Sequence, residues 1–190
     1  MPTPAGHAIG GLAAVLLASS LSRRPGLLPP ALLLAGAAAA VLPDLDLLGG
    51  SHRTYTHSIG GVAIVGVMSW LVLRRRLANA PAAAIAIMAA HASHLLLDWL
   101  GKDTSSPPGL TMLWPFSSEY LLSGFNVFGE VSRRYWLADE FIFGNVRALV
   151  WELTLLMPAL LVAWVVWSGR TLVSNKENGT RKTEKNGVTR

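Results

Sequence analysis

Eight of the histidine and acidic side chains in the sequence are candidate metal ligands by their type and position. Five are histidines and three are aspartates, and the chain contains no cysteine. Imidazole and carboxylate groups without thiolate suit Zn²⁺ best, with Mn²⁺ and Fe²⁺ as alternatives. Eight groups exceed the four that one tetrahedral ion needs, so two ions could share them, as in two-metal phosphoesterases. The set consists of His7, Asp44, Asp46, His52, His57, His91, His94 and Asp98.

The spacing of these residues supports this chemistry. His91, His94 and Asp98 are separated by three and then four residues, so they share one face of a helix. A histidine and an aspartate one turn apart can chelate a single cation. Asp44 and Asp46 stand two residues apart after a proline, where a turning backbone lets both reach one ion or a neighbouring pair. A structural or proton-relay role for these groups is the alternative.

The elements that must position these side chains are long apolar segments. Only 14% of the residues are charged and 52% are hydrophobic, whereas a soluble domain has about 25% charged residues. A helix needs about 20 apolar residues to cross a membrane. The chain has five runs without Asp, Glu, Lys or Arg that meet or approach that length. The last run does so when residues 148–151 are added to it. We therefore expect an all-α, polytopic membrane helix bundle of about five transmembrane helices. The runs are 1–22, 25–43, 54–73, 77–97 and 153–169.

Basic residues predict the orientation of this bundle. Eleven of the 16 Lys and Arg residues lie at 23–24, at 74–76 and after residue 169. The positive-inside rule assigns these segments to the cytoplasm, with the N-terminus outside the inner (plasma) membrane and the C-terminus inside. Because topology accounts for the net charge of +5, we expect no nucleic-acid partner. The expected partners are the lipid bilayer and a substrate, and protein partners stay unknown.

On this topology, all eight candidate ligands fall at outer helix ends or in outer connections. The orientation was derived from Lys and Arg alone, so this convergence is an independent observation. Ionisable groups at membrane depth are costly and usually mark a functional site. We expect residues 1–173 to form the membrane-embedded domain that carries the metal site. Residues 102–147 form an outer interfacial loop region, and residues 174–190 form a disordered basic cytoplasmic tail.

Several of these motifs, in this order, resemble the YdjM-like family over about residues 5–120. They are His7, Pro43-Asp44-Leu45-Asp46, His52-Arg53, Thr56-His57-Ser58, His94-Leu-Leu-Leu-Asp98, and the stretch from Asp98 to Leu113-Trp-Pro-Phe116. Members of that family are described as inner-membrane, metal-dependent hydrolases, some of them labelled LexA-binding. The resemblance implies a metal site formed by His7, Asp44, Asp46, His52, His57, His94 and Asp98, and does not require His91. The pattern is also loosely similar to zinc-dependent phospholipases C.

The sequence therefore favours a membrane-embedded metal-dependent hydrolase that acts at the outer face on a phosphoester or lipid-linked substrate. The expected metal ligands are His7, Asp44, Asp46, His57, His94 and Asp98. His52 and His91 are candidates for proton transfer or for orienting a ligand, and Arg53 for binding an anionic oxygen. Two alternatives stay open: a non-enzymatic membrane adaptor or regulatory protein with a structural metal site, and a proton-coupled transporter.

Overall fold

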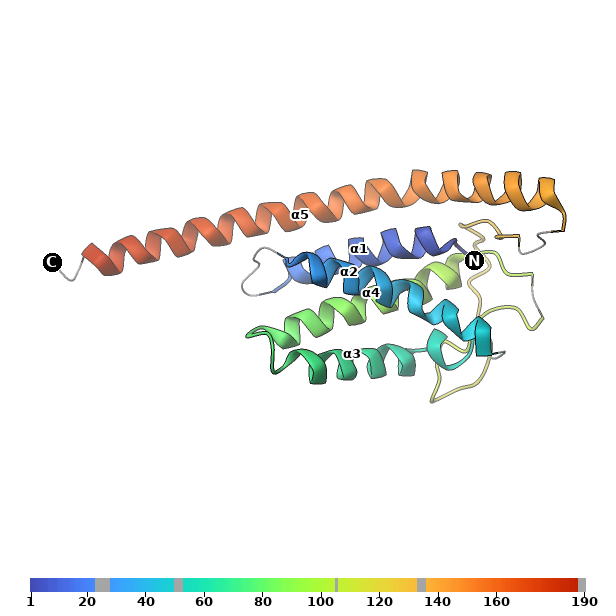
Figure 1. The fold of residues 1–190 in the computed structure, drawn as a ribbon, viewed down its shortest axis with the longest axis horizontal. Coiled ribbons are helices and arrows are strands. Elements are labelled where there is room, and N and C mark those ends of the chain that lie inside the picture. The colour runs from blue at the N-terminus through green and yellow to red at the C-terminus, as the bar shows by residue number, and fades with distance from the viewer. Residues whose placement is uncertain (23–27, 50–52, 105, 133–135, 188–190) are drawn as a thin grey trace.

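The computed structural model describes residues 1–22, 28–49, 53–104, 106–132 and 136–187 (Figure 1). Across these ranges the fold is all-α and contains no strand, as the sequence predicts. The α-helices are α1 (Pro4–Ser20), α2 (Pro30–Val41), α3 (Ile59–Leu73), α4 (Ala80–Leu100) and α5 (Asn145–Gly187). Two 3₁₀ helices, η1 (Leu42–Gly49) and η2 (Tyr55–His57), and a π-helix, η3 (Glu140–Gly144), complete the described elements.

Successive α-helices run in opposite directions along the bundle (Figure 1). The N-terminal ends of α1, α3 and α5 therefore lie at the same end as the C-terminal ends of α2 and α4. Residues 101–132 form most of the connection at this end. They hold the start of α3, because Ile59 donates its backbone N–H to the Met112 carbonyl and Gly60 donates to the Trp114 carbonyl. The expected outer loop region thus folds back over the helix ends.

Helices α1 and α4 form the centre of the bundle. Helix α4 packs against α1, α2 and α3, whereas α5 packs mainly on α1. Small residues bring α1 and α2 close together: a Cβ added at Gly11 would lie 2.4 Å from the Ala40 Cβ, and one added at Gly36 would lie 2.3 Å from Val15 Cγ2. Close contacts through small residues are typical of helices packed in membranes.

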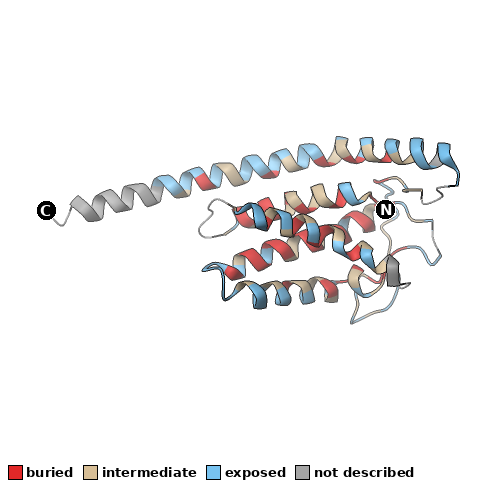
Figure 2. Cartoon of the chain, viewed as in Figure 1, coloured by how far each residue is buried: buried red, intermediate tan, exposed pale blue. Residues whose placement is uncertain are grey.

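Many large apolar side chains are exposed on the bundle, among them Leu34, Ile64 and Leu161, and Figure 2 shows exposed residues along α3 and α5. Helix α4 and the segment Phe141–Lys176 are each long and apolar enough to cross a membrane, and α1 and α3 are shorter apolar helices. Helix α2 has 12 residues and rises about 18 Å, which is less than a hydrocarbon core of about 30 Å. The prediction of five α-helices is therefore confirmed for the described ranges, while five membrane spans stay a prediction.

The C-terminal segment differs from the expectation of a disordered tail. Helix α5 continues to Gly187, so residues 174–187 are helical, and residues 188–190 lie outside the described ranges. The polar composition of this segment suggested disorder because it cannot bury apolar surface. Extending an existing helix, however, avoids the cost of nucleating a new one, and α5 supplies that nucleus.

Candidate metal centre

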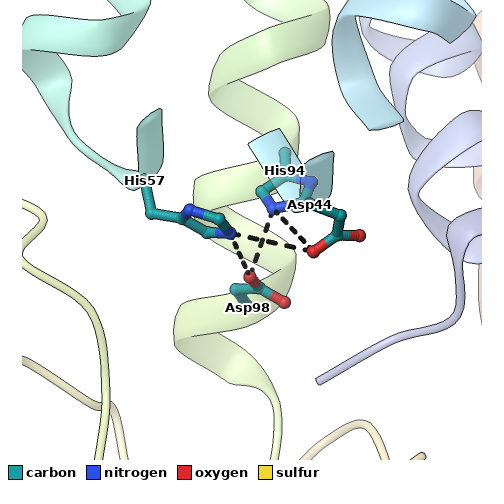
Figure 3. Close-up of side chains that lie close together, drawn as sticks. All are labelled: Asp44, His57, His94 and Asp98. Atoms are coloured by element: carbon teal, nitrogen blue, oxygen red, sulfur yellow. Dashed lines mark ion pairs between the residues drawn. The ribbon is translucent and has the colours of Figure 1, made fainter. Parts of the chain in front are cut away.

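Four of the predicted ligands meet at the end of the bundle where the connection folds over (Figure 3). They are Asp44 from η1, His57 from η2, and His94 and Asp98 from α4. Each offers one ligand atom, and these four atoms all lie within 4.8 Å of one another. We call these four residues the metal cluster. The pair on α4 is one helical turn apart, as the sequence spacing predicts.

The distances in the metal cluster are close to those of a tetrahedral site. Asp98 Oδ2 lies 3.2 Å from His94 Nε2 and 3.5 Å from His57 Nε2. Asp44 Oδ1 lies 3.8 Å from His57 Nε2 and 3.9 Å from His94 Nε2. In a tetrahedral zinc site with bonds of about 2.0–2.1 Å, neighbouring ligand atoms lie about 3.3 Å apart. The two Asp98 distances are near this value, and the two Asp44 distances are about half an ångström longer.

His94 is oriented by the backbone of α2. Its Nδ1 lies 2.7 Å from the Ala40 carbonyl oxygen and donates a hydrogen bond to it. The neutral imidazole then has its lone pair on Nε2, the nitrogen that faces Asp98. This contact depends on the close approach of α1 and α2 at Gly11, because a larger residue there would displace Ala40.

His57 is oriented by a carboxylate. Its Nδ1 lies 3.1 Å from Asp46 Oδ2, and the same oxygen accepts hydrogen bonds from Thr56 Oγ1 at 2.5 Å and from the Arg53 backbone N–H at 3.1 Å. Such a carboxylate behind a histidine fixes the tautomer that leaves Nε2 to bind metal. Asp46, predicted as a ligand, is thus outside the metal cluster and contacts it through His57.

His7, also a predicted ligand, lies directly beside the metal cluster. Its ring stacks on the His94 ring with centroids 3.8 Å apart, and its Nε2 lies 3.3 Å from Asp98 Oδ1. The two oxygens of Asp98 therefore face different histidines, since Oδ2 faces His57 and His94. A carboxylate in this position could bridge two ions.

Several polar atoms at the centre are buried and lack a hydrogen-bond partner within the described part of the chain. They are His94 Nε2, both carboxylate oxygens of Asp98 and both ring nitrogens of His7. Leaving such groups without a partner is costly. When Nδ1 of His94 carries the proton, its Nε2 is an acceptor, and so is the Asp98 Oδ2 that faces it. A cation between these two atoms relieves their repulsion. The residues present therefore fit a divalent metal ion.

The electrostatics of η1 and η2 also favour a positive charge at this point. Burial alone lowers the pKa of His57, but the neighbouring carboxylates of Asp44 and Asp46 outweigh that effect and raise the pKa to about 9. Burial raises the pKa of Asp44, and the nearby imidazoles, that of His57 first and then those of His94 and His7, bring it below its usual value. A metal ion would take the place of the proton on His57.

Two of the residues predicted to act in catalysis are bound to other groups. The guanidinium of Arg53 contacts the Asp103 carboxylate and donates a hydrogen bond to the Gly109 carbonyl at 3.2 Å, and Asp103 in turn accepts the Gly109 N–H at 2.7 Å. His91 Nε2 lies 3.0 Å from the Thr56 carbonyl and donates to it. Both residues are buried and hold the segment around η2 in place. His52 lies outside the described residues.

Sequence reasoning missed three contributions to the centre. The Ala40 carbonyl is a main-chain acceptor, which has no sequence signal. Thr56 belongs to the Thr56-His57-Ser58 motif but was not predicted to have a role. Its hydroxyl donates a hydrogen bond to Asp46, and its carbonyl accepts one from His91. Asp103, which is not among the predicted site residues, has a buried side chain that contacts Arg53.

Comparisons with known proteins identify the family of this chain. The family model of the YdjM inner membrane protein matches residues 1–171. The inner membrane protein YbcI of Escherichia coli (strain K12) is 31% identical over 138 residues, which cover 67% of this chain and 75% of YbcI. No solved structure matches the chain. The matched region contains every residue of the metal cluster, and both names place these proteins in the inner membrane. The chain therefore belongs to the YdjM inner membrane protein family.

Proposed function

We propose that this protein is a membrane-embedded, metal-dependent hydrolase whose site is the metal cluster. The observation that carries this proposal is the convergence of two imidazole nitrogens and two carboxylate oxygens within 4.8 Å of one another. Each imidazole is oriented through its other nitrogen, His94 by the Ala40 carbonyl and His57 by Asp46. Zn²⁺ suits this donor set best, with Mn²⁺ or Fe²⁺ as alternatives.

The reaction proposed is hydrolysis of a phosphoester. Water adds to phosphorus, the bond from phosphorus to the leaving oxygen breaks, and that oxygen takes a proton as the alcohol departs. A divalent ion supplies Lewis acidity and a water of lowered pKa. The chain's own part is to hold the ion through Asp44, His57, His94 and Asp98. His7, beside Asp98 Oδ1, is positioned as a further ligand or as part of a second ion site.

Arg53 and His91 are assigned positioning roles in this proposal. Arg53 links Asp46, through its backbone N–H, to Asp103, through its guanidinium. His91 holds the Thr56 carbonyl, one residue before His57. These contacts support the segment that carries His57, and neither side chain needs to touch the substrate. His52 keeps its predicted role in proton transfer as a proposal from sequence alone.

The second candidate function is a non-enzymatic protein with a structural metal site. The observation in its favour is that His57, His94 and Asp98 are fully buried, because structural zinc sites are closed whereas catalytic ones keep an open position. Asp44 retains 25% side-chain exposure, which favours the catalytic proposal. A transporter is disfavoured because the metal cluster lies at one end of the bundle, in η1, in η2 and in the C-terminal turns of α4.

Metal analysis coupled to an activity screen tests the proposal. Protein purified in detergent without chelators should contain about one equivalent or more of a transition metal. The His94→Ala and Asp98→Asn variants should lose most of it. The wild-type protein should hydrolyse a phosphodiester such as bis(p-nitrophenyl) phosphate, and both variants should not. Metal-free wild-type protein would contradict the metal site, and bound metal without hydrolysis would favour the structural role.

The proposed orientation places the metal cluster on the periplasmic side of the inner membrane. It rests on the Lys and Arg distribution together with the alternating helix directions in Figure 1. Reporter fusions after Arg76 and after Asp103 test it, because these positions lie at opposite ends of α4. The two fusions should report opposite sides of the membrane, with Arg76 in the cytoplasm. The same side for both would refute the topology.

A further inference from the structure

An exposed apolar stripe runs along α2 and into η1. Its members follow one another at intervals of three or four residues, which places them on one face of a helix. The 3₁₀ turn keeps Leu42 and Leu45 on the same side, since residues three apart eclipse in that helix. Leu34, Leu42 and Leu45 are 73%, 50% and 55% exposed. We call this surface the α2 stripe; it consists of Ala31, Leu34, Ala38, Leu42 and Leu45.

The α2 stripe ends beside the one member of the metal cluster that reaches the surface. His57, His94 and Asp98 have no exposed side-chain surface, whereas the Asp44 side chain is 25% exposed. Asp44 lies between Leu42 and Leu45 in the sequence of η1. Within the described part of the chain, Asp44 is therefore the member of the metal cluster that is open to a reactant, and it stands in the same 3₁₀ helix as these two leucines, two residues after Leu42 and one before Leu45.

The α2 stripe is longer than one lipid leaflet is deep, so it is long enough for an acyl chain to lie along it. The rise along the helix axis is about 16 Å for the eleven α-helical steps from Ala31 to Leu42. The three 3₁₀ steps to Leu45 add about 6 Å, which gives about 22 Å in total. One leaflet contributes about half of a hydrocarbon core of about 30 Å. Because the chain belongs to an inner membrane family, an exposed apolar face of this length is continuous with the lipid-contacting surface. Lipid tails can therefore lie along it up to Asp44.

We propose that the α2 stripe binds the acyl chain of the substrate, so that the substrate is a long-chain phosphoester lipid whose head group reaches the metal cluster beside Asp44. This inference rests on the proposed hydrolase function. The apolar chain stays in the leaflet along Leu34, Leu42 and Leu45, and the ester phosphorus meets the cluster where the site opens. Hydrolysis then uses one water, cleaves one phosphorus–oxygen bond and releases one alcohol and one phosphate product.

Chain-length selectivity tests this proposal. The probes are dioleoyl phosphatidylglycerol in mixed micelles and dihexanoyl phosphatidylglycerol as a monomer, which share a head group and differ in chain length. The variants Leu42→Gln and Leu45→Gln should lower kcat/KM for the long-chain lipid by about tenfold or more, since each desolvated methylene contributes about a threefold to fourfold factor. They should leave kcat/KM for the short-chain lipid and the metal content unchanged. Leu161→Gln, at an exposed leucine of α5, is the matched control.

Photo-crosslinking gives a readout that does not depend on turnover. A phosphatidylglycerol with a diazirine in one acyl chain, used at substoichiometric amounts, should label residues 31–45 at least about fivefold more than the exposed face of α5. Leu45→Gln should reduce that labelling. Equal labelling of the two surfaces, or equal losses of activity on both chain lengths, would overturn the inference. Absence of any hydrolysis by metal-loaded wild-type protein would refute the proposed function instead, and the labelling pattern would then decide the α2 stripe alone.

Discussion

Replacing Asp46 by Asn separates a residue that orients a ligand from one that binds metal. Asn has nearly the same shape as Asp but no charge, so it keeps the packing around η1 and weakens the contact to His57 Nδ1, which is 3.1 Å long. Hydrogen bonds to ionised acceptors are roughly twice as strong as neutral ones. Loss of such a partner behind a ligating histidine lowers metal affinity by about 10–100-fold, or about 1.4–2.8 kcal/mol.

The affinity of the detergent-solubilised protein for Zn²⁺, measured in competition with a chromophoric chelator, checks this magnitude. The direct ligand Asp98 provides the comparison. If about 12 kcal/mol of binding energy is shared by four ligands, each contributes about 3 kcal/mol, so Asp98→Asn should weaken binding by about 150-fold. Glu119→Gln, a change of the same charge at an exposed residue of the connection, should leave affinity unchanged.

A double-mutant cycle makes the test decisive, because Asp46 is expected to act only through His57. In a His57→Ala background, adding Asp46→Asn should change the affinity for Zn²⁺ by less than about twofold, whereas adding Asp98→Asn should still weaken it strongly. A loss of tenfold or more from Asp46→Asn in that background would refute the assignment, since it would show that Asp46 binds the ion independently of His57.

Three further predictions concern packing, anchoring and protonation. Gly11→Val should lower the midpoint of thermal unfolding, with overpacking against Ala40 costing about 1–3 kcal/mol; an unchanged midpoint would contradict the close packing. Glu152→Ala, which removes the buried carboxylate that accepts the Thr3 N–H and hydroxyl at 2.8 and 2.5 Å, should cost about 1–3 kcal/mol yet leave Zn²⁺ affinity intact. Because the pKa of His57 is raised to about 9, Zn²⁺ binding at pH 7 should release about one proton and tighten as the pH rises toward 9; calorimetry in buffers of different ionisation enthalpy would detect the absence of such release. In the metal-free protein the protonated His57 contributes stability below about pH 6.5 that is lost as the pH rises through about 9.

Charge distribution and apolar run lengths sufficed to predict the helical fold and the end at which the candidate ligands gather. The reason is physical: long charge-free runs become helices in a membrane because every backbone polar group must be satisfied internally. The spacing of His94 and Asp98 likewise predicted their shared face. Which runs are long enough to span was less predictable, since Pro30 begins α2 five residues after the start of its run.

Which residues face the metal cluster and which orient its histidines was harder to predict than which residues lie near the site. Asp44 and Asp46 are equivalent in the sequence, yet one faces the metal cluster and the other accepts the Nδ1–H of His57. That distinction depends on the backbone of η1 and on Arg53, whose positive φ of 68° aims its N–H at Asp46. A left-handed backbone at arginine is uncommon, and it arises from tertiary contacts that no local pattern encodes.

The last helix is joined to the rest of the bundle mainly along α1, and every residue of the metal cluster precedes Gly101. A helix with one principal neighbour can be detached and returned without rebuilding the remaining helix contacts. Two separately expressed fragments, 1–132 and 136–190, would then assemble in the bilayer much as one chain does. The first fragment would hold the ion, and the second would serve as a replaceable support. The chain thereby resembles a four-helix unit that contains the metal cluster and a docked fifth helix, and α5 is the part most open to exchange.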